Sequence, residues 1–332
     1  MFWTLLPLYL PSTSIVNFSF IHYLMVMRLL IVLLLFPAIS FSQNREVASH
    51  RYVAFTFDDL PSTHSNAKYV IEYLTEKLVK HHVPAIGFVN ESKLYDDDKS
   101  NKAKISLLEL WLNSNLDLGN HSYSHISIDN VTLSSYKADV LRGEKITKEL
   151  LKERGKKLMY YRHTQLRTGP TLEIKNDLEK FLKEHDYTIA PVTIDNNDYI
   201  FANIYEKAKL KNDSAMMKTI GLEYLKYMEI IVKHFEELSL DFLGYEIKQT
   251  LLLHANTLNA DYLDEMIQLF QDRNYEFISL HEALKDPAYQ LEDVPVKKGL
   301  SWLHRWMLAK GLEIKEEPSE SKLISELFKS YK

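Results

Sequence analysis

The sequence predicts an α/β protein whose strands form a parallel barrel. Short runs of apolar and β-branched residues alternate with longer segments whose apolar residues recur at helical spacing. This alternation is typical of βα units and a parallel sheet. We expect six or seven such units, and the chain lacks a glycine-rich dinucleotide-binding turn, which favours a barrel over a Rossmann-type sheet.

The predicted strands are short. The first, "RYVAFTFDD" at 51–59, is apolar and β-branched and ends in carboxylates. The third begins "LDLGNHSYSH" at 116–125 and leads into a polar loop, which is too rich in small and hydroxyl residues to be core. The remaining strands are expected within residues 85–90, 158–164, 187–198, 249–256 and 275–284.

The predicted helices lie between these strands. Apolar spacing indicates a helix over 68–82, and a serine cap opens a long amphipathic helix over 133–154. The segment 203–237 is helical and exceeds the length of an ordinary connection. We expect it to form one or two helices beside the mouth of the barrel, either lining the groove or as bulk packing. Further helices are expected at 105–114, 170–185 and 260–274.

Composition excludes several function classes. The chain has 332 residues, enough for one large α/β domain or two smaller ones. Its net charge of −5, with acids and bases well mixed, lacks the basic stripe of a nucleic-acid binder. It contains no cysteine, which excludes disulfides, thiolate zinc sites and cysteine nucleophiles. Any metal must therefore be held by imidazole and carboxylate groups.

The N-terminus differs from the rest of the chain. No Lys, Arg, Asp or Glu occurs from Met1 to Met27, and Arg28 then precedes the apolar run "LLIVLLLFPAISFSQ", which ends at Gln43. One positive charge, an apolar core and small residues form the pattern of a secretory signal peptide. We therefore expect residues 1–43 to be an apolar extension and signal peptide.

A retained membrane anchor is the alternative for this segment. The apolar core 29–36 is short for a span of about 20 residues, and Pro37 interrupts it. We favour export to the periplasm or the medium, with no stable membrane insertion after cleavage. Met25 or Met27 would be a better start than Met1, because the positive charge would then lie at the N-terminus.

Two further regions follow the signal segment. We expect a catalytic domain over 44–286 and a C-terminal extension over 287–332. The extension contains "GLSWLHRWMLAKG" at 299–311, with two Trp, one His and one Arg. These residues could form a platform on which a glycan stacks, but we favour a helix that packs on the barrel.

Polar residues gather where the predicted strands end. In a parallel barrel the carboxyl ends of the strands share one face, and active sites are built there. The residues at these ends are Asp58, Asp59, His121, His125, Arg162, His163, Asp195, Asp198 and His254.

This set of residue types suits metal-assisted hydrolysis. Two imidazoles and one carboxylate can hold a divalent metal and leave positions open. Adjacent aspartates on a strand point to opposite sides, so Asp58 and Asp59 can both serve only where the strand ends and twists. One could then bind the metal while the other takes a proton, or one could cap a turn.

The chain resembles the polysaccharide deacetylase family, also called carbohydrate esterase family 4, over most of residues 51–285. Each motif is weak alone, but all of them occur in order on the expected elements. They are "TFDD" (56–59), "HSYSH" (121–125), "YRHT" (161–164), "DNNDY" (195–199) and "LLLH" (251–254).

The resemblance implies a distorted (β/α)7-type barrel, here with a helical insertion near 203–243 and the C-terminal extension. It also implies one divalent metal, zinc first, with cobalt, manganese or nickel as alternatives. The metal ligands would be Asp59, His121 and His125.

The same resemblance implies the acid–base groups. Asp58 would be the general base and His254 the general acid. Arg162 would orient Asp58, and Asp198 would orient and tune His254. The predicted substrate contacts are His163, Asp195 and Tyr199.

The chain departs from the family pattern around the groove. "YRHT" lacks the proline of its motif, and Thr164 stands where an aromatic residue is usual. Leu60 follows Asp59 where glycine is usual, and Phe201 stands where an arginine often follows the fourth motif. We interpret this as an intact catalytic set beside a rebuilt substrate groove.

The sequence thus predicts a hydrolase that removes acetyl groups from N-acetylated amino sugars of a polysaccharide. Its expected partner is an acetylated glycan, with no nucleic acid; the oligomeric state is not predicted. A de-O-acetylase, an amidase on another substrate, and an inactive glycan-binding protein of the same fold are the alternatives.

Overall fold

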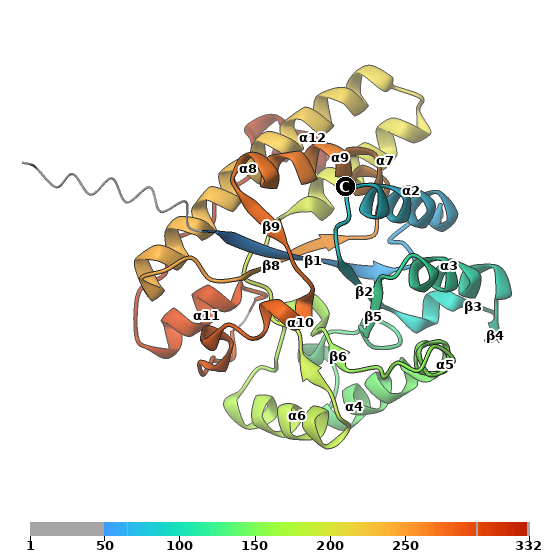
Figure 1. Ribbon diagram of the computed structural model, residues 1–332, viewed down its shortest axis with the longest axis vertical. Coiled ribbons are helices and arrows are strands. Elements are labelled where there is room, and N and C mark those ends of the chain that lie inside the picture. Colours follow the sequence, from blue (N-terminus) through green and yellow to red (C-terminus); the bar gives the residue numbers. More distant parts are fainter. Residues whose placement is uncertain (1–49, 65, 297, 331–332) are drawn as a thin grey trace, which may run out of the picture. The chain divides into compact units, whose positions relative to one another are not determined.

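The computed structural model describes residues 50–64, 66–296 and 298–330, which belong to one compact unit (Figure 1). The predictions for residues 1–43 lie outside this part of the chain. The strands are β1 (Arg51–Leu60), β2 (Ala85–Val89), β3 (Tyr95–Asp96), β4 (Lys99–Ser100), β5 (Asp117–Asn120), β6 (Tyr160–Tyr161), β7 (Thr188–Ile189), β8 (Gln249–His254) and β9 (Tyr275–Phe277).

Helices surround the main sheet, as Figure 1 shows. They are α2 (Ala67–Lys80), α3 (Lys102–Asn113), α4 (Leu133–Arg142), α5 (Lys145–Lys152), α6 (Leu172–Glu184), α7 (Asp198–Leu210), α8 (Ser214–Leu243), α9 (Thr257–Asp272), α10 (Leu280–Ala283), α11 (Trp302–Ala309) and α12 (Lys322–Ser330). Short 3-10 helices are η1 (Glu91–Leu94), η2 (Ile128–Asn130), η3 (Thr164–Leu166) and η4 (Pro287–Gln290).

The main sheet is parallel and curled, which confirms the predicted α/β class. Its strand order is β7-β6-β5-β2-β1-β8, and β9 pairs with β1. β1 is the organising strand, because it pairs with β2, β8 and β9. A parallel bridge between Ile194 and Leu251 links the segment after β7 to β8. The sheet is therefore a distorted barrel in which this side is joined by irregular chain.

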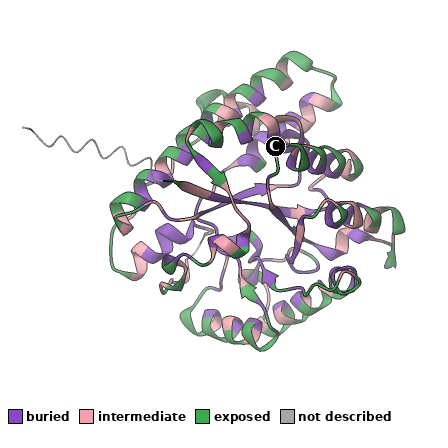
Figure 2. Cartoon of the chain, viewed as in Figure 1, coloured by how far each residue is buried: buried purple, intermediate pink, exposed green. Residues whose placement is uncertain are grey.

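Burial explains why these segments became strands. Val53, Phe55 and Phe57 of β1 are at most 1% exposed. All five residues of β2 are also buried, so this central strand is covered on both faces. Such two-sided burial is what continuous apolar runs indicate in a parallel sheet. In Figure 2 the strands are mostly buried, whereas the helices alternate between buried and exposed positions.

One predicted helix is divided. The segment predicted as a single helix over 133–154 forms α4 and α5, with a break at Gly143. The backbone of Gly143 packs against the loop after β5: a Cβ built there would lie 2.3 Å from the carbonyl carbon of Ser122. The close approach of two backbones, which periodicity does not reveal, accounts for the glycine at the break.

The helical insertion and the C-terminal extension both pack on the barrel. The 203–237 prediction is confirmed as two helices, α7 and α8. In α11, Trp302 is 5% and Trp306 1% exposed, so the packing interpretation is right and the stacking platform is wrong. Arg305 anchors α11: its buried guanidinium donates to the Leu166 carbonyl and, at 3.0 Å, to Thr168 Oγ1.

Among the described residues, no helix is both long and apolar enough to cross a bilayer.

Candidate active site

The end of β1 carries the two adjacent aspartates. Asp58 is 2% exposed and remains in the parallel ladder, where its Cα partner is His254. Asp59 has φ 71°, in the left-handed region, which is uncommon for a residue other than glycine. This backbone change at Asp59 lets both carboxylates reach one cavity, as the sequence required of them.

The loop after β5 carries the two histidines, and it too contains left-handed residues. Ser122 has φ 65° and His125 has φ 56°. The Ser122 hydroxyl accepts a hydrogen bond of 3.1 Å from the His125 backbone N–H, which fixes the turn. Left-handed residues of this kind cost roughly 1–3 kcal/mol each and cluster at functional sites.

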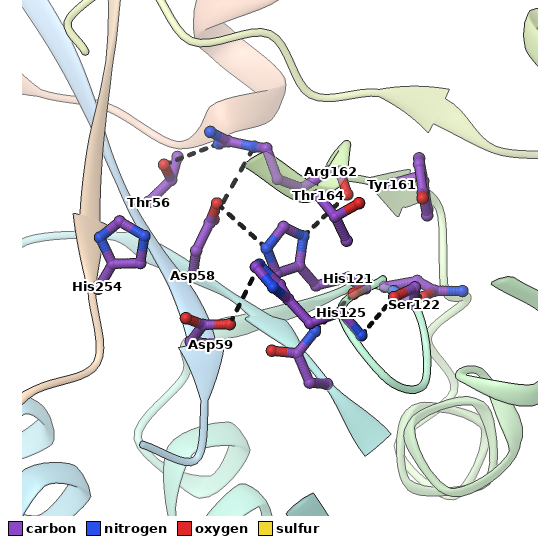
Figure 3. Close-up of polar contacts among 12 residues, drawn as sticks. Thr56, Asp58, Asp59, His121, Ser122, His125, Tyr161, Arg162, Thr164 and His254 are labelled. Carbon is purple, nitrogen blue, oxygen red and sulfur yellow. Dashed lines mark hydrogen bonds and ion pairs between the residues drawn. The ribbon is translucent and has the colours of Figure 1, made fainter. Parts of the chain in front are cut away.

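Asp59, His121 and His125 form a group that fits a divalent metal. Each offers one ligand atom, and these atoms all lie within 4.8 Å of one another. Nδ1 of His121 lies 2.9 Å from the Arg162 carbonyl oxygen, to which it donates. This hydrogen bond leaves the Nε2 lone pair free, the arrangement usual for metal-binding imidazoles. Figure 3 shows the group beside Asp58 and His254.

The charge state of this group also suits a metal. Burial lowers the pKa of both His121 and His125 to about 4, so the imidazoles are neutral at physiological pH. Burial alone would raise the pKa of Asp59, but nearby positive charge, chiefly the Lys93 ammonium, holds that pKa below its usual range. One carboxylate and two neutral imidazoles are therefore available as ligands.

Asp58 occupies a different environment. Its Oδ2 lies 3.6 Å from His121 Nε2, and its Oδ1 lies 3.9 Å from Arg162 Nε, an ion pair rather than a hydrogen bond. Arg162 is fully buried and donates to Thr56 Oγ1 at 2.8 Å. Burial raises the pKa of Asp58, although Arg162 opposes the rise.

His254 is held by Asp198. Nδ1 of His254 donates to Asp198 Oδ1 at 2.7 Å, and the His254 backbone N–H donates to Asp198 Oδ2 at 2.9 Å. The Asn259 side chain adds a third hydrogen bond to Asp198, 2.7 Å long. Burial would lower the pKa of His254, but Asp198 outweighs it and raises that pKa to about 10. The imidazole is therefore protonated at neutral pH, with Nε2 as its remaining donor.

A cavity of about 1100 Å³ contains these groups. Asp58, Asp59, His121, His125 and His254 all line it. Part of its wall comes from the C-terminal extension, through residues 298–300, His304 and residues 314–319. None of residues 203–243 lines the cavity; Tyr199, in the first turn of α7, does so but precedes the insertion. The bulk-packing interpretation of 203–237 therefore describes α8.

The predicted substrate contacts divide into two kinds. Asp195 and Tyr199 line the cavity, and the Tyr199 side chain is exposed. Burial and the Glu317 carboxylate raise the pKa of Asp195 to about 7. His163, in contrast, is fully buried, stacks on Trp302 with ring centroids 6.3 Å apart, and does not line the cavity. Its role as a substrate contact stays a prediction.

Sequence reasoning missed Lys93, Thr56 and Asn259. Thr56 and Asn259 bond Arg162 and Asp198, and nothing in their local sequence distinguishes them from ordinary core residues. Lys93 was open to prediction, because it lies shortly after the end of β2 and the carboxyl ends of the strands were the expected location of the site. Its ammonium lies 3.3 Å from Asp59 Oδ1.

Residues 45–190 match the family model described as polysaccharide deacetylase. No curated protein matches the chain.

Solved structures with similarity to the chain include one pseudoenzyme and two peptidoglycan deacetylases. A CE4 family pseudoenzyme from Bacillus anthracis has 15% identity and a TM-score of 0.47, over 71% of this chain and 66% of that one. The Bc1960 peptidoglycan N-acetylglucosamine deacetylase has 20% identity and a TM-score of 0.46, over 70% of this chain and 87% of that one. Peptidoglycan deacetylase PdaC from Bacillus subtilis has 20% identity and a TM-score of 0.43, over 71% of this chain and 93% of that one.

The matched region contains the residues that form the metal-type group. "TFDD", "HSYSH" and "YRHT" all lie within 45–190, whereas Asp198 and His254 lie beyond it. Through residues 45–190, which make up less than half of its length, the chain is similar to the polysaccharide deacetylase family.

Proposed function

We propose that the protein is a metal-dependent hydrolase that removes acetyl groups from N-acetylated amino sugars of a polysaccharide of the peptidoglycan or chitin type. One observation carries the proposal. Asp58 and His254, Cα partners across the β1–β8 ladder, line the same cavity as Asp59, His121 and His125. A proton acceptor, a proton donor and a metal-type donor set in one cavity are what hydrolysis by an activated water requires.

The residues have separate roles in this proposal. Asp59, His121 and His125 would hold a divalent ion, which would supply the Lewis acidity needed at the acetyl carbonyl and at the attacking water. Asp58 accepts the proton of the attacking water, and its raised pKa makes it a better base than an ordinary carboxylate. Arg162, 3.9 Å from Asp58, keeps that carboxylate oriented.

His254 completes the reaction as the general acid. An amine leaves poorly until it is protonated, and Nε2 of His254 can donate that proton. The Asp198 carboxylate fixes the other ring nitrogen at 2.7 Å, which orients the ring and keeps it charged. The reaction needs no covalent nucleophile, in agreement with a chain that contains no cysteine.

We propose that the glycan meets Asp195 and Tyr199 on the cavity wall. Both residues line the cavity, and the exposed Tyr199 ring offers a face for a sugar. His163, fully buried against Trp302, supports the same wall from within.

An activity screen on acetylated glycans tests the function. The panel contains N-acetylated and O-acetylated glycans, each incubated with the protein, with and without a chelator. Release of acetate from N-acetylated glycans, lost with chelator and restored by Zn²⁺, is the expected result. Release only from O-acetylated glycans would favour a de-O-acetylase. Glycan binding without any acetate release would favour an inactive binding protein.

The proposed site of action is outside the cytoplasm, in the periplasm or the medium. The apolar run after Arg28 supports this, because it has the pattern of a signal peptide. N-terminal sequencing of protein from the native host should then begin near Gln43. Recovery of residues 1–40 in the mature protein would contradict export by cleavage.

A further inference from the structure

Lys93 brings a positive charge to the proposed metal ligand Asp59. It lies in η1, shortly after β2, and its side chain is 29% exposed. Its Nζ donates to the Asp59 backbone oxygen at 3.0 Å and lies 3.3 Å from Asp59 Oδ1. Lys93 does not line the cavity, so its ammonium reaches Asp59 from the protein side.

The contacted oxygen is also the one nearest to His125. Asp59 Oδ1 lies 3.7 Å from His125 Nε2. Two ligand atoms each about 2.1 Å from one tetrahedral ion lie roughly 3.4 Å apart, so this pair is spaced as ligands of a shared ion are. The ammonium and a divalent ion would therefore act on the same carboxylate oxygen.

We propose that Lys93 is a built-in counter-cation of Asp59, which stabilises the metal-free site and opposes the binding of a divalent ion. The inference rests on the proposed metal-binding role of Asp59. Its chemistry is electrostatic: without a metal, Asp59 and the neighbouring Asp58 are two largely buried carboxylates, and Lys93 compensates the first of them. A bound ion provides the same compensation, so the two cations are in competition.

A positioning role for Lys93 would change metal affinity in the opposite direction. If Lys93 served chiefly to hold the Asp59 carboxylate in place, its removal would weaken metal binding. Ordering one short carboxylate restricts only two torsions, whereas repulsion between an ammonium and a divalent ion acts at close range in a poorly screened, buried site. Repulsion is the larger effect, and the removal of Lys93 should therefore tighten metal binding.

A thermodynamic cycle links metal affinity to stability. Removal of one partner of a buried ion pair leaves an uncompensated charge, which destabilises the metal-free protein. In the metal-loaded protein the ion compensates Asp59, so the same substitution costs less. The substitution therefore lowers the free energy of unfolding by two different amounts, one without metal and one with it. The difference between these amounts must equal the gain in the free energy of metal binding.

Lys93→Met tests the proposal, since methionine keeps the length of the side chain and removes its charge. Zn²⁺ alone is titrated against a competing chelator, and thermal unfolding is followed with and without Zn²⁺. We expect the Zn²⁺ dissociation constant to fall at least tenfold. The metal-free Tm should drop, and the rise in Tm on adding Zn²⁺ should exceed that of the wild type. Lys93→Arg, which keeps the charge, should stay near the wild type.

Lys77 offers a matched control. Its Nζ donates to the Asp261 backbone oxygen at 2.7 Å and lies 3.3 Å from Asp264 Oδ2, so it repeats the chemistry of Lys93 at residues that do not line the cavity. Lys77→Met should lower the Tm equally with and without Zn²⁺ and leave the affinity unchanged.

The outcomes separate this inference from the proposed metal site. Zn²⁺ binding by the wild type that Asp59→Asn abolishes supports the metal site. If the Zn²⁺ affinity of Lys93→Met is then unchanged or weaker, the counter-cation role of Lys93 is overturned and the metal site is retained. If neither the wild type nor Lys93→Met binds Zn²⁺, both proposals fall. Should Lys93→Met not fold, Lys93→Gln gives the same comparison with a neutral polar side chain.

Discussion

Asp58 and His254 are Cα partners in the parallel ladder between β1 and β8. Adjacent strands lie about 4.8 Å apart, so the proposed base and acid approach the cavity from neighbouring backbones. Neither belongs to the metal-type group, which is built from Asp59 and the loop after β5. The geometry therefore separates proton transfer from metal binding, and substitutions should separate them too.

The adjacent aspartates should give opposite phenotypes. Asp58→Asn keeps the shape but removes the proton acceptor, so the deacetylation rate should fall by roughly 10²–10⁴ while the metal stays bound. Asp59→Asn, His121→Ala and His125→Ala remove a ligand and should lose the metal. Elemental analysis and turnover are measured on each variant. Metal loss in Asp58→Asn with retention in Asp59→Asn would reverse the assignment.

Removal of the Asp198 charge should change the pH dependence of the rate. In the wild type, burial would lower the pKa of His254, but Asp198 raises it to about 10, so the acid form persists through neutral pH and is lost as pH rises through that value. In Asp198→Asn burial acts without this opposition, and the alkaline limb of kcat/KM should move to lower pH. A limb that does not move would show that His254 is not the acid.

Gly143→Ala should disturb the metal site from outside it. The new Cβ would lie 2.3 Å from the Ser122 carbonyl carbon and 2.5 Å from the Tyr123 nitrogen. Both are backbone atoms, so neither can move away without displacing the loop. We expect a loss of about 1–3 kcal/mol in stability and a weaker Zn²⁺ affinity, because the loop that carries both histidines must shift. Urea denaturation and Zn²⁺ titration measure the two effects.

Gly155→Ala is the control for this substitution. A Cβ there meets nothing within 4 Å, although φ is 68°. It should cost roughly 1–2 kcal/mol through backbone strain alone and leave Zn²⁺ affinity unchanged. Equal Zn²⁺ affinities in the two alanine variants would disprove the link between Gly143 and the site.

Glu246 should make stability fall with rising pH. Its carboxylate accepts from Gln249 at 3.0 Å and Tyr275 at 2.8 Å, but burial raises its pKa from 4.5 to about 7. Because the folded pKa exceeds the unfolded one, this contribution to stability is present below pH 4.5 and is lost as pH rises through about 7.

Glu246→Gln should remove this dependence. The amide keeps an acceptor oxygen and cannot ionise, so the variant should be more stable than the wild type at pH 8, by on the order of 2 kcal/mol. Below pH 4.5 the two proteins should differ little. Urea unfolding at both pH values measures the difference in unfolding free energy between the two proteins. A difference that does not change with pH would contradict the role of Glu246.

The sequence predicted those parts of the fold that rest on local pattern. The alternation of apolar runs predicted the α/β class, and the carboxyl ends of β1, β5 and β8 supplied Asp58, Asp59, His121, His125 and His254. The lengths of β6 and β7 were overestimated, because only two residues of each pair in the sheet although their apolar runs are longer. Strand pairing depends on the neighbouring strand, which a single segment does not contain.

Features made by distant contacts were not predictable. The wall formed by residues 314–319 depends on how α11 docks, and this in turn depends on Arg305 reaching the carbonyl of Leu166. A buried arginine in an apolar helix gives no sequence signal for its partner. The burial of His163 under Trp302 is of the same kind, because a histidine at a strand end can face either the cavity or the core.

The central position of β1 determines the order in which the parts of the site become available during synthesis. Thr56 of β1 bonds Leu251 of β8 across 195 residues of chain, whereas the metal-type residues lie between positions 59 and 125. A chain made from its N-terminus thus presents Asp59, His121 and His125 long before His254 leaves the ribosome. The nascent protein therefore acquires its metal-type residues first and the proposed proton donor late, so the proposed site is complete only after β8 has joined β1.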